Sequence, residues 1–278
     1  MKDILDFLAT LPAIPIDRLV GIITLAAIGC AVFALYVVLA REGARSLKKK
    51  LPLFVKLPSA WINAGGLRDF TWKPDGSDNL AALMVLVVIA QHMDPDDGVA
   101  RLTFTQLSDM ASIGREKVAR ALDILAKRGL VERWTDGRST YQVVGYDASA
   151  GWAKLPVKGL YQNGVVAAFQ DFRLRRRSEL DALKLYLLFA ARRSNDTNLA
   201  KIGYDKIEEY TGVTRPHIRS ALSVLGAHSL VQIERFNSEV SDNGVANAYR
   251  LSHLDSYRHM GTIGRADPHL VSSAFDDL

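Results

Sequence analysis

The residues from Leu80 to Val131 recur, 100 positions further along the chain, as the residues from Leu180 to Val231. The same residue, or one of the same class, stands at nearly every apolar position. The matching positions are Leu80, Ala82, Leu83, Ala90, Leu107, Ile113, Val118, Ala121, Leu122, Leu125, Leu130 and Val131 in the first copy, and Leu180, Ala182, Leu183, Ala190, Ile207, Val213, Ile218, Ala221, Leu222, Leu225, Leu230 and Val231 in the second. A duplication that keeps its apolar positions while its polar positions change indicates one small module that is present twice.

Local patterns in the first copy predict two helices and a hairpin. Residues 105–111 form a short amphipathic stretch, residues 112–114 a turn, and residues 115–128 a helix with four apolar residues on one face. Gly129 fits the position that ends this helix. Residues 130–134 and 139–146 then predict two strands joined by a turn at 135–138.

The second copy repeats this order with a longer hairpin. Residues 207–211 match the first helix, residues 212–213 the turn, and a second helix opens at Thr214 and Pro216, where proline suits a first turn. Its hairpin is predicted from strands at 232–236 and 248–251, with a polar tip at 237–247. Each copy follows a related segment, Lys56-Leu57-Pro58 or Lys154-Leu155-Pro156, and a long apolar helix, "NLAALMVLVVIAQHM" or "ELDALKLYLLFAARRS".

The segments "LTFTQLSDMASIGREKVARALDILAKRGLVERW" and "IGYDKIEEYTGVTRPHIRSALSVLGAHSLVQIERF" both resemble winged helix-turn-helix DNA-binding domains. The resemblance covers the two copies but neither terminus. In layout, the pair is similar to plasmid replication initiators, which carry two winged helices in one chain. The expected fold is therefore mainly α with small β-hairpins, an α+β class, with two winged-helix modules.

This resemblance implies that the second helix of each turn enters the major groove and that the hairpin contacts the DNA backbone or minor groove. The implied contacts in the second copy are Thr214, Arg215, His217, Arg219, Ser220, Arg235 and Asn237. Arginines 173, 175, 176 and 177 lie before its first helix and are either further backbone contacts or part of a linker. In the first copy the implied contacts are Arg115, Lys117, Arg120, Arg133 and Arg138, with acidic Glu116, Asp123 and Asp136 among them.

Charge is distributed unevenly along the chain. Its net charge of +5 arises from −1 over residues 1–40, +5 over 41–56, −2 over 57–147, +5 over 148–254 and −2 over 255–278. A polyanion should therefore prefer the second copy. The first copy is instead a candidate surface for a homodimer or another protein partner.

Residues 19–40 contain no charged side chain. A helix of this length spans about 33 Å, enough to cross a bilayer, so we expect a single transmembrane helix in place of a buried helix or a cleaved signal peptide. Most flanking Lys and Arg residues follow the span, which predicts that the two modules face the cytoplasm of a bacterial inner membrane. The basic segment also suits anionic lipid headgroups, with residues 41–56 as the expected contact.

The expected organisation is a short N-terminal segment at 1–18, the transmembrane helix at 19–40 and a basic juxtamembrane linker at 41–55. Winged-helix module one occupies 56–147, a linker and module two 148–254, and a polar tail 255–278. The tail lacks periodicity and is expected to be extended or disordered.

Enzyme motifs are missing from the sequence. The six histidines show no metal-ligand spacing with carboxylates, and the single cysteine, Cys30, fits a reducing compartment. We expect no catalytic residues, metal or cofactor. Three functions remain open: a membrane-tethered transcriptional regulator or DNA anchor that binds double-stranded DNA, a replication initiator of a plasmid or mobile element, and a winged-helix scaffold that binds protein at the membrane.

Overall fold

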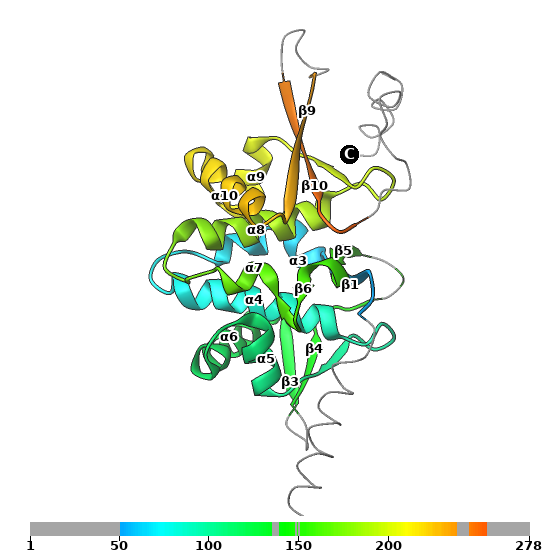
Figure 1. The fold of residues 1–278 in the computed structure, drawn as a ribbon, viewed down its shortest axis with the longest axis vertical. Helices are drawn as coiled ribbons and strands as arrows, with labels where there is room; N and C mark the ends of the chain where they lie inside the picture. Colours follow the sequence, from blue (N-terminus) through cyan, green and yellow to red (C-terminus); the bar gives the residue numbers. More distant parts are fainter. Residues whose placement is uncertain (1–50, 135–138, 148, 150, 238–244, 255–278) are drawn as a thin grey trace, which may run out of the picture. The chain divides into compact units, whose positions relative to one another are not determined.

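The computed structural model describes residues 51–134, 139–147, 149, 151–237 and 245–254, which all belong to one compact unit that begins at Leu51. This unit has the expected α+β class, with helices and small antiparallel sheets (Figure 1). The expected transmembrane helix at 19–40, the basic linker up to residue 50 and the tail at 255–278 lie outside the described residues. Among the described residues, no helix combines the length and apolarity needed to cross a bilayer.

The first copy contains five helical elements and four strands among its described residues. In chain order these are β1 (Phe54–Pro58), α3 (Ala60–Asn63), η1 (Gly66–Asp69), α4 (Gly76–His92), β2 (Val99–Arg101), α5 (Phe104–Ala111), α6 (Arg115–Lys127), β3 (Val131–Trp134) and β4 (Thr140–Val143). Strand β4 lies between β2 and β3 in a three-stranded antiparallel sheet.

The second copy repeats the central part of this order. Its elements are β5 (Trp152–Pro156), η2 (Lys158–Leu160), β6 (Tyr161–Gln162), β7 (Val165–Val166), α7 (Ala167–Gln170), α8 (Arg177–Arg192), β8 (Leu199–Lys201), α9 (Tyr204–Thr211), α10 (Arg215–Ala227), β9 (Val231–Asn237) and β10 (Val245–Leu251). Strand β10 lies between β8 and β9, as β4 does between β2 and β3. The lead-in from β5 to α7 differs from its counterpart in the first copy.

Local chemistry explains where the short helices begin and end. Thr103 accepts a hydrogen bond from the amide of Gln106, whose side chain accepts one from the Thr103 amide, which forms a capping box at the start of α5. The residue after each first helix is left-handed, Ser112 with φ 53° and Gly212 with φ 68°. Glycine adopts the left-handed conformation without steric strain. Ser112 therefore lowers the stability of the turn in the first copy, whereas Gly212 does not do so in the second.

The hairpins keep the repeat but differ from their predicted bounds. Tyr141 of β4 lies opposite Ala100, and Tyr249 of β10 lies opposite Ala200, with both tyrosines completely buried. Strands β9 and β10 continue to the pair Asn237 and Val245, well into the segment predicted to be a polar tip. Strand β4 ends at Val143 and not at residue 146. The hydrogen bonds between strands join backbone groups and do not depend on side-chain polarity. The polarity of the sequence therefore predicts the ends of these strands poorly.

The two copies interlock through their lead-in strands. Strands β1 and β5 pair antiparallel, with Lys56 opposite Lys154, so equivalent residues of the two lead-ins face each other. The Gln91 side chain of α4 donates to the Pro156 carbonyl, and Lys184 of α8 donates to the Phe70 carbonyl. Gln91 of the first copy thus binds the end of β5, and Lys184 of the second copy binds the residue after η1.

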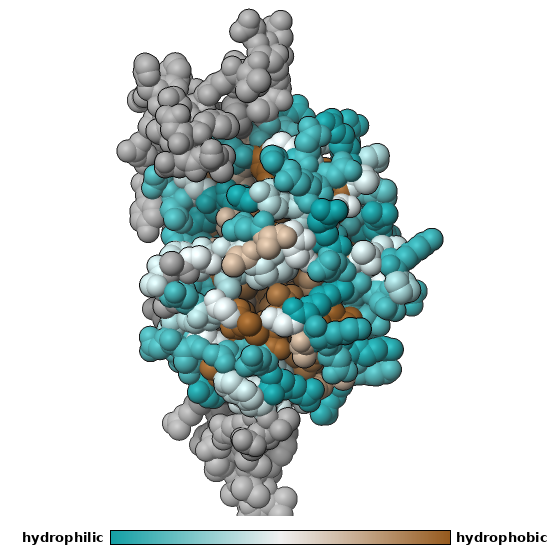
Figure 2. All heavy atoms as spheres, turned by 180° about the vertical axis from the view of Figure 1, so that it is seen from behind, coloured by the Kyte–Doolittle hydropathy of each residue, from teal (hydrophilic) through white to brown (hydrophobic). Residues whose placement is uncertain are grey.

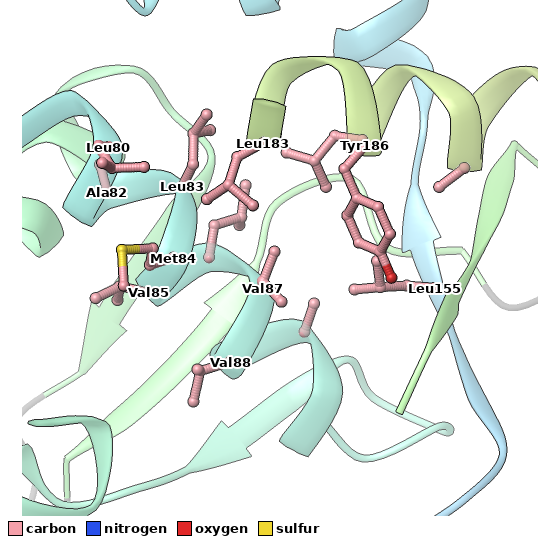
Figure 3. Packing of buried hydrophobic residues seen from close by; sticks show 14 of the residues in the cluster. Leu80, Ala82, Leu83, Met84, Val85, Val87, Val88, Leu155, Leu183 and Tyr186 are labelled. Carbon is pink, nitrogen blue, oxygen red and sulfur yellow. The ribbon is translucent and has the colours of Figure 1, made fainter. Parts of the chain in front are cut away.

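The core is continuous across both copies. Leu83 of α4 and Leu183 of α8, equivalent residues of the repeat, point into the space between the two helices (Figure 3). Leu122 and Leu222 are buried, as the repeat predicts. On the face opposite to that of Figure 1, polar atoms cover most of the surface and hydrophobic atoms show mainly in its middle (Figure 2). Most of the apolar repeat thus stabilises the unit by its burial.

Candidate nucleic-acid interface

Helix α10 has one buried and one exposed face. Its buried residues, Ile218, Ala221, Leu222 and Leu225, pack toward α8. Arg219, Ser220 and Ser223 stand on the exposed part of the helix. Among the described residues, no acidic side chain lies within ion-pairing distance of Arg219. The exposed face therefore offers a cation and small hydroxyl groups that suit phosphate oxygens or base edges.

The first turn of α10 holds the other predicted contacts. Arg215 donates to Asp205 of α9 over 2.6 Å, with the two side chains 62% and 82% exposed. An ion pair so exposed to water is weak, and a phosphate can replace the carboxylate. The Thr214 hydroxyl lies 2.9 Å from Nδ1 of His217, which is half-buried. This bond holds the imidazole at the start of the helix.

The arginines before α8 extend this basic surface. Arg175 and Arg176 are exposed, whereas Arg177 pairs with Asp181 over 3.2 Å. Burial raises the pKa of the Asp181 carboxyl, and the charges of Arg177 and Lys184 oppose this rise. Helices α8 and α10 pack against each other. The two interpretations of this run, a contact with the DNA backbone or a linker, both stay predictions.

On the equivalent surface of the first copy, Asp78 pairs with two of the predicted contacts. Lys117 donates to Asp78 over 2.6 Å and to the Ser77 hydroxyl over 3.0 Å, and it points toward α4 and not away from the protein. Arg120 lies 3.6 Å from the same carboxylate and 3.3 Å from Glu116. Of the predicted contacts on α6, only Arg115 is exposed without an ion pair among the described residues.

Asp78 was missed by the sequence analysis. The acidic residues noted there were Glu116, Asp123 and Asp136, all near the predicted contacts in the sequence, whereas Asp78 lies 39 positions before Lys117. A comparison of the two copies could have found it, because the position equivalent to Asp78 is Ser178 and that of Lys117 is His217. At these two positions the second copy has neither the carboxylate of Asp78 nor the ammonium of Lys117.

The hairpins carry the remaining predicted contacts. Arg235 is exposed on β9. Arg133 of β3 lies with its guanidinium 5.2 Å from the centre of the Phe104 ring, which holds it against α5. Arg138 and the side chain of Asn237 lie outside the described residues. The arginine of the second hairpin is therefore exposed, whereas that of the first hairpin packs against an aromatic ring.

No family model matches the chain, and no curated protein matches it significantly. Within the described residues, no group of three or more His, Cys, Asp or Glu side chains could hold a metal ion. The assignment of this surface therefore rests on its residues, their geometry and the repeat.

Proposed function

We propose that the chain binds double-stranded DNA at a membrane, with its second copy as the main DNA-binding module. In this proposal both copies are winged helix-turn-helix modules, α10 enters the major groove, and the hairpin of β9 and β10 contacts the backbone. Residues 19–40 anchor the protein in a bacterial inner membrane, with the modules in the cytoplasm. The order of helices and strands in each copy and the sheet orders support this fold.

The observation that carries the proposal is the difference between the two recognition-helix surfaces. The second copy presents Arg219 and Arg215 on exposed positions of α10, with Arg215 paired to the exposed Asp205, and it exposes Arg175 and Arg176 before α8. In the first copy, Asp78 binds Lys117 and lies near Arg120. Because sequence-independent affinity for DNA comes largely from neutralised phosphates, the second copy should supply most of it.

The first copy better suits a protein partner. Two of its predicted DNA contacts are paired with Asp78, and the residue Trp134, at the end of β3, is 45% exposed. Tryptophan is among the residues that contribute most to protein interfaces. A homodimer or a second protein bound there would leave the second copy available for DNA.

A salt titration tests DNA binding. The fragment 51–278, which begins where the compact unit begins, should retard random and genomic double-stranded DNA in a gel. The logarithm of its affinity should fall linearly as the logarithm of salt concentration rises, because bound phosphates release counterions. If the folded fragment retards no DNA at low salt, the proposal of DNA binding is wrong. The function as a protein-binding scaffold would then be favoured.

The tether has its own test. A reporter that fluoresces only in the cytoplasm, fused after Leu278, should be active in cells, and a reporter active only outside the cytoplasm should be silent. The reverse pattern would refute the orientation and remove DNA as a partner. Origin unwinding and plasmid maintenance assays would separate an initiator from a regulator or anchor.

A further inference from the structure

The first lead-in, residues 54–70, packs against helices of the second copy. Helix α3 contacts α8, beside which Figure 1 draws it, and η1 contacts α9. One contact joins Arg68 of η1 to Gly212, in the turn between α9 and α10. A Cβ atom at position 212 would lie 3.7 Å from Cγ of Arg68 and 3.9 Å from its Cα and Cβ. The stem of Arg68 therefore lies against the turn that precedes the proposed recognition helix.

Arg68 brings an exposed positive charge to this turn. Among the described residues, no acidic side chain lies within ion-pairing distance of its guanidinium. Two carboxylates in this region also lack an ion pair among the described residues. They belong to Asp69, the next residue, and to Glu208, whose carbonyl accepts a hydrogen bond from the Gly212 amide over 2.7 Å. Loss of the Arg68 charge would therefore leave the turn with an acidic balance.

Acidic side chains elsewhere on α9 are already paired. Asp205 lies 2.6 Å from Arg215, and Glu209 lies 2.9 Å from Lys206. A phosphate near the turn thus meets these two carboxylates with their charges partly balanced. Arg68 is the cation that the first lead-in adds to this surface.

The second lead-in, residues 152–172, carries no charge at the equivalent position. Both lead-ins end in the same two residue types, Asp-Phe at 69–70 and at 171–172. Each pair contacts the residue that follows the second helix of its own copy. Arg128 donates to the Asp69 carbonyl and lies over the Phe70 ring, and His228 lies near the Asp171 carboxylate and the Phe172 ring. The residue before the second pair, the counterpart of Arg68, is the exposed Gln170.

From these contacts we infer that Arg68, a residue of the first copy, completes the DNA-binding surface of the second copy by contacting a phosphate beside the start of α10. This inference rests on the proposed DNA binding. Arginine contacts to phosphate position a protein on the duplex and add to affinity irrespective of sequence. The second lead-in contacts α5 of the first copy through β7 but offers Gln170 in place of an arginine. Only one copy thus gains a cation from the lead-in of the other.

The test titrates DNA binding by the full chain, kept in a mild detergent, against salt. Arg68→Gln gives the first lead-in the residue of the second. The loss of one phosphate contact should weaken binding and reduce the slope of log affinity against log salt by about 0.9. The ratio of wild-type to variant affinity should consequently shrink about three- to fourfold between about 50 and 200 mM salt. Arg68→Lys keeps the charge and should keep the slope.

The matched control is Lys158→Gln, which removes one exposed positive charge from η2 of the second lead-in. Gly159 of η2 lies against His253, and Figure 1 draws β5, which precedes η2, on the side away from α10. We expect this variant to keep the wild-type slope. Circular dichroism checks that each variant folds, and Arg68→Met, which also removes the charge, replaces Arg68→Gln if that variant does not fold.

Three results would overturn the inference and leave DNA binding intact. The first is an unchanged slope for folded Arg68→Gln or Arg68→Met. The second is an equal loss of slope in Lys158→Gln, which would mean that net charge alone sets the slope. The third is an equal loss in Arg68→Lys, which would mean that Arg68 acts by the packing of its stem. If the wild-type chain binds no DNA at low salt, both the inference and the proposed function are wrong.

Discussion

Leu122 and Leu222 illustrate how the repeat acts at the scale of single residues. Both lie on the buried face of the second helix of their copy, and each is nearly inaccessible to water. The polar residue that follows each of them, Asp123 or Ser223, is exposed. The alternation predicted from the sequence is therefore present at these positions, because burial selects apolar side chains with the period of a helix.

Truncation of either leucine should destabilise the protein. We expect Leu122→Ala and Leu222→Ala each to lower the free energy of unfolding by about 2–5 kcal/mol, since each removes buried methyl groups and leaves a cavity. Urea unfolding of the fragment 51–278 measures this loss, with Ser223→Ala as an exposed control of little effect. Unchanged midpoints for both leucine variants would mean that these residues form a surface stripe.

Lys184 is a buried charge in the second copy. Its ammonium donates to the Phe70 carbonyl of the first copy, and Asp181 lies nearby. Burial lowers the pKa of Lys184 to about 8, against the opposing effect of Asp181. Below this pKa the lysine is charged in both folded and unfolded chains, and the folded state bears the full cost of burying it.

Stability should consequently rise with pH through the window set by Lys184. Between about pH 8 and the ordinary lysine pKa near 10.5, the unfolded chain binds more protons than the folded one, so the free energy of unfolding increases with pH. Lys184→Met should flatten this rise. Urea unfolding of both proteins across the window measures the difference. Parallel pH profiles would show that Lys184 titrates alike in the folded and unfolded states.

At the scale of elements, the sequence predicted local structure better than pairing. Helices α5, α6, α9 and α10 start or end within a few residues of their expected bounds, because apolar periodicity and turn residues act locally. The pairing of β1 with β5 and the bond from Lys117 to Asp78 join residues far apart in the sequence, and no local pattern reports such contacts. The exposed positions on α10 follow from helical periodicity, whereas the contact of Asp78 with Lys117 shows in the sequence only when the two copies are compared.

Exchange of Asp78 tests this contact. We expect Asp78→Ser, which gives the first copy the residue of the second, to release Lys117 and Arg120 and to raise DNA affinity. The control is Asp123→Ser on α6, which also replaces an aspartate by the serine of the second copy and removes the same charge. Among the described residues, Asp123 has no ion pair. Gel shifts at fixed salt compare the two variants. Equal gains from both would mean that net charge, and not the local pairing, controls affinity.

At the scale of the whole molecule, the two copies are joined by strand pairing, hydrogen bonds and a shared core. The β1–β5 pair and the bonds of Gln91 and Lys184 cross from one copy to the other, and the buried core runs through α4 and α8. A duplicated sequence alone suggests two independent modules. The crossing lead-ins make independent folding costly, since each copy alone would expose the surface that the other covers.

Unfolding should therefore be a single event. For the fragment 51–278, we expect tryptophan fluorescence and far-ultraviolet circular dichroism to give coincident urea transitions. Separate fragments 56–147 and 148–254 should show no cooperative transition. Two resolved transitions in the fragment 51–278, or cooperative folding of the separate copies, would contradict the interlocked arrangement.

The division of labour between the copies is the central claim, and paired arginine variants test it most directly. Arg215→Ala with Arg219→Ala should weaken DNA binding markedly and reduce the salt slope by up to about two units, one for each lost phosphate contact. Arg115→Ala with Arg120→Ala should do less, because Asp78 and Glu116 already lie beside Arg120. The measurement is the affinity of the folded fragment for DNA across a range of salt concentrations. Equal losses from the two double variants, or no loss from either, would contradict the account.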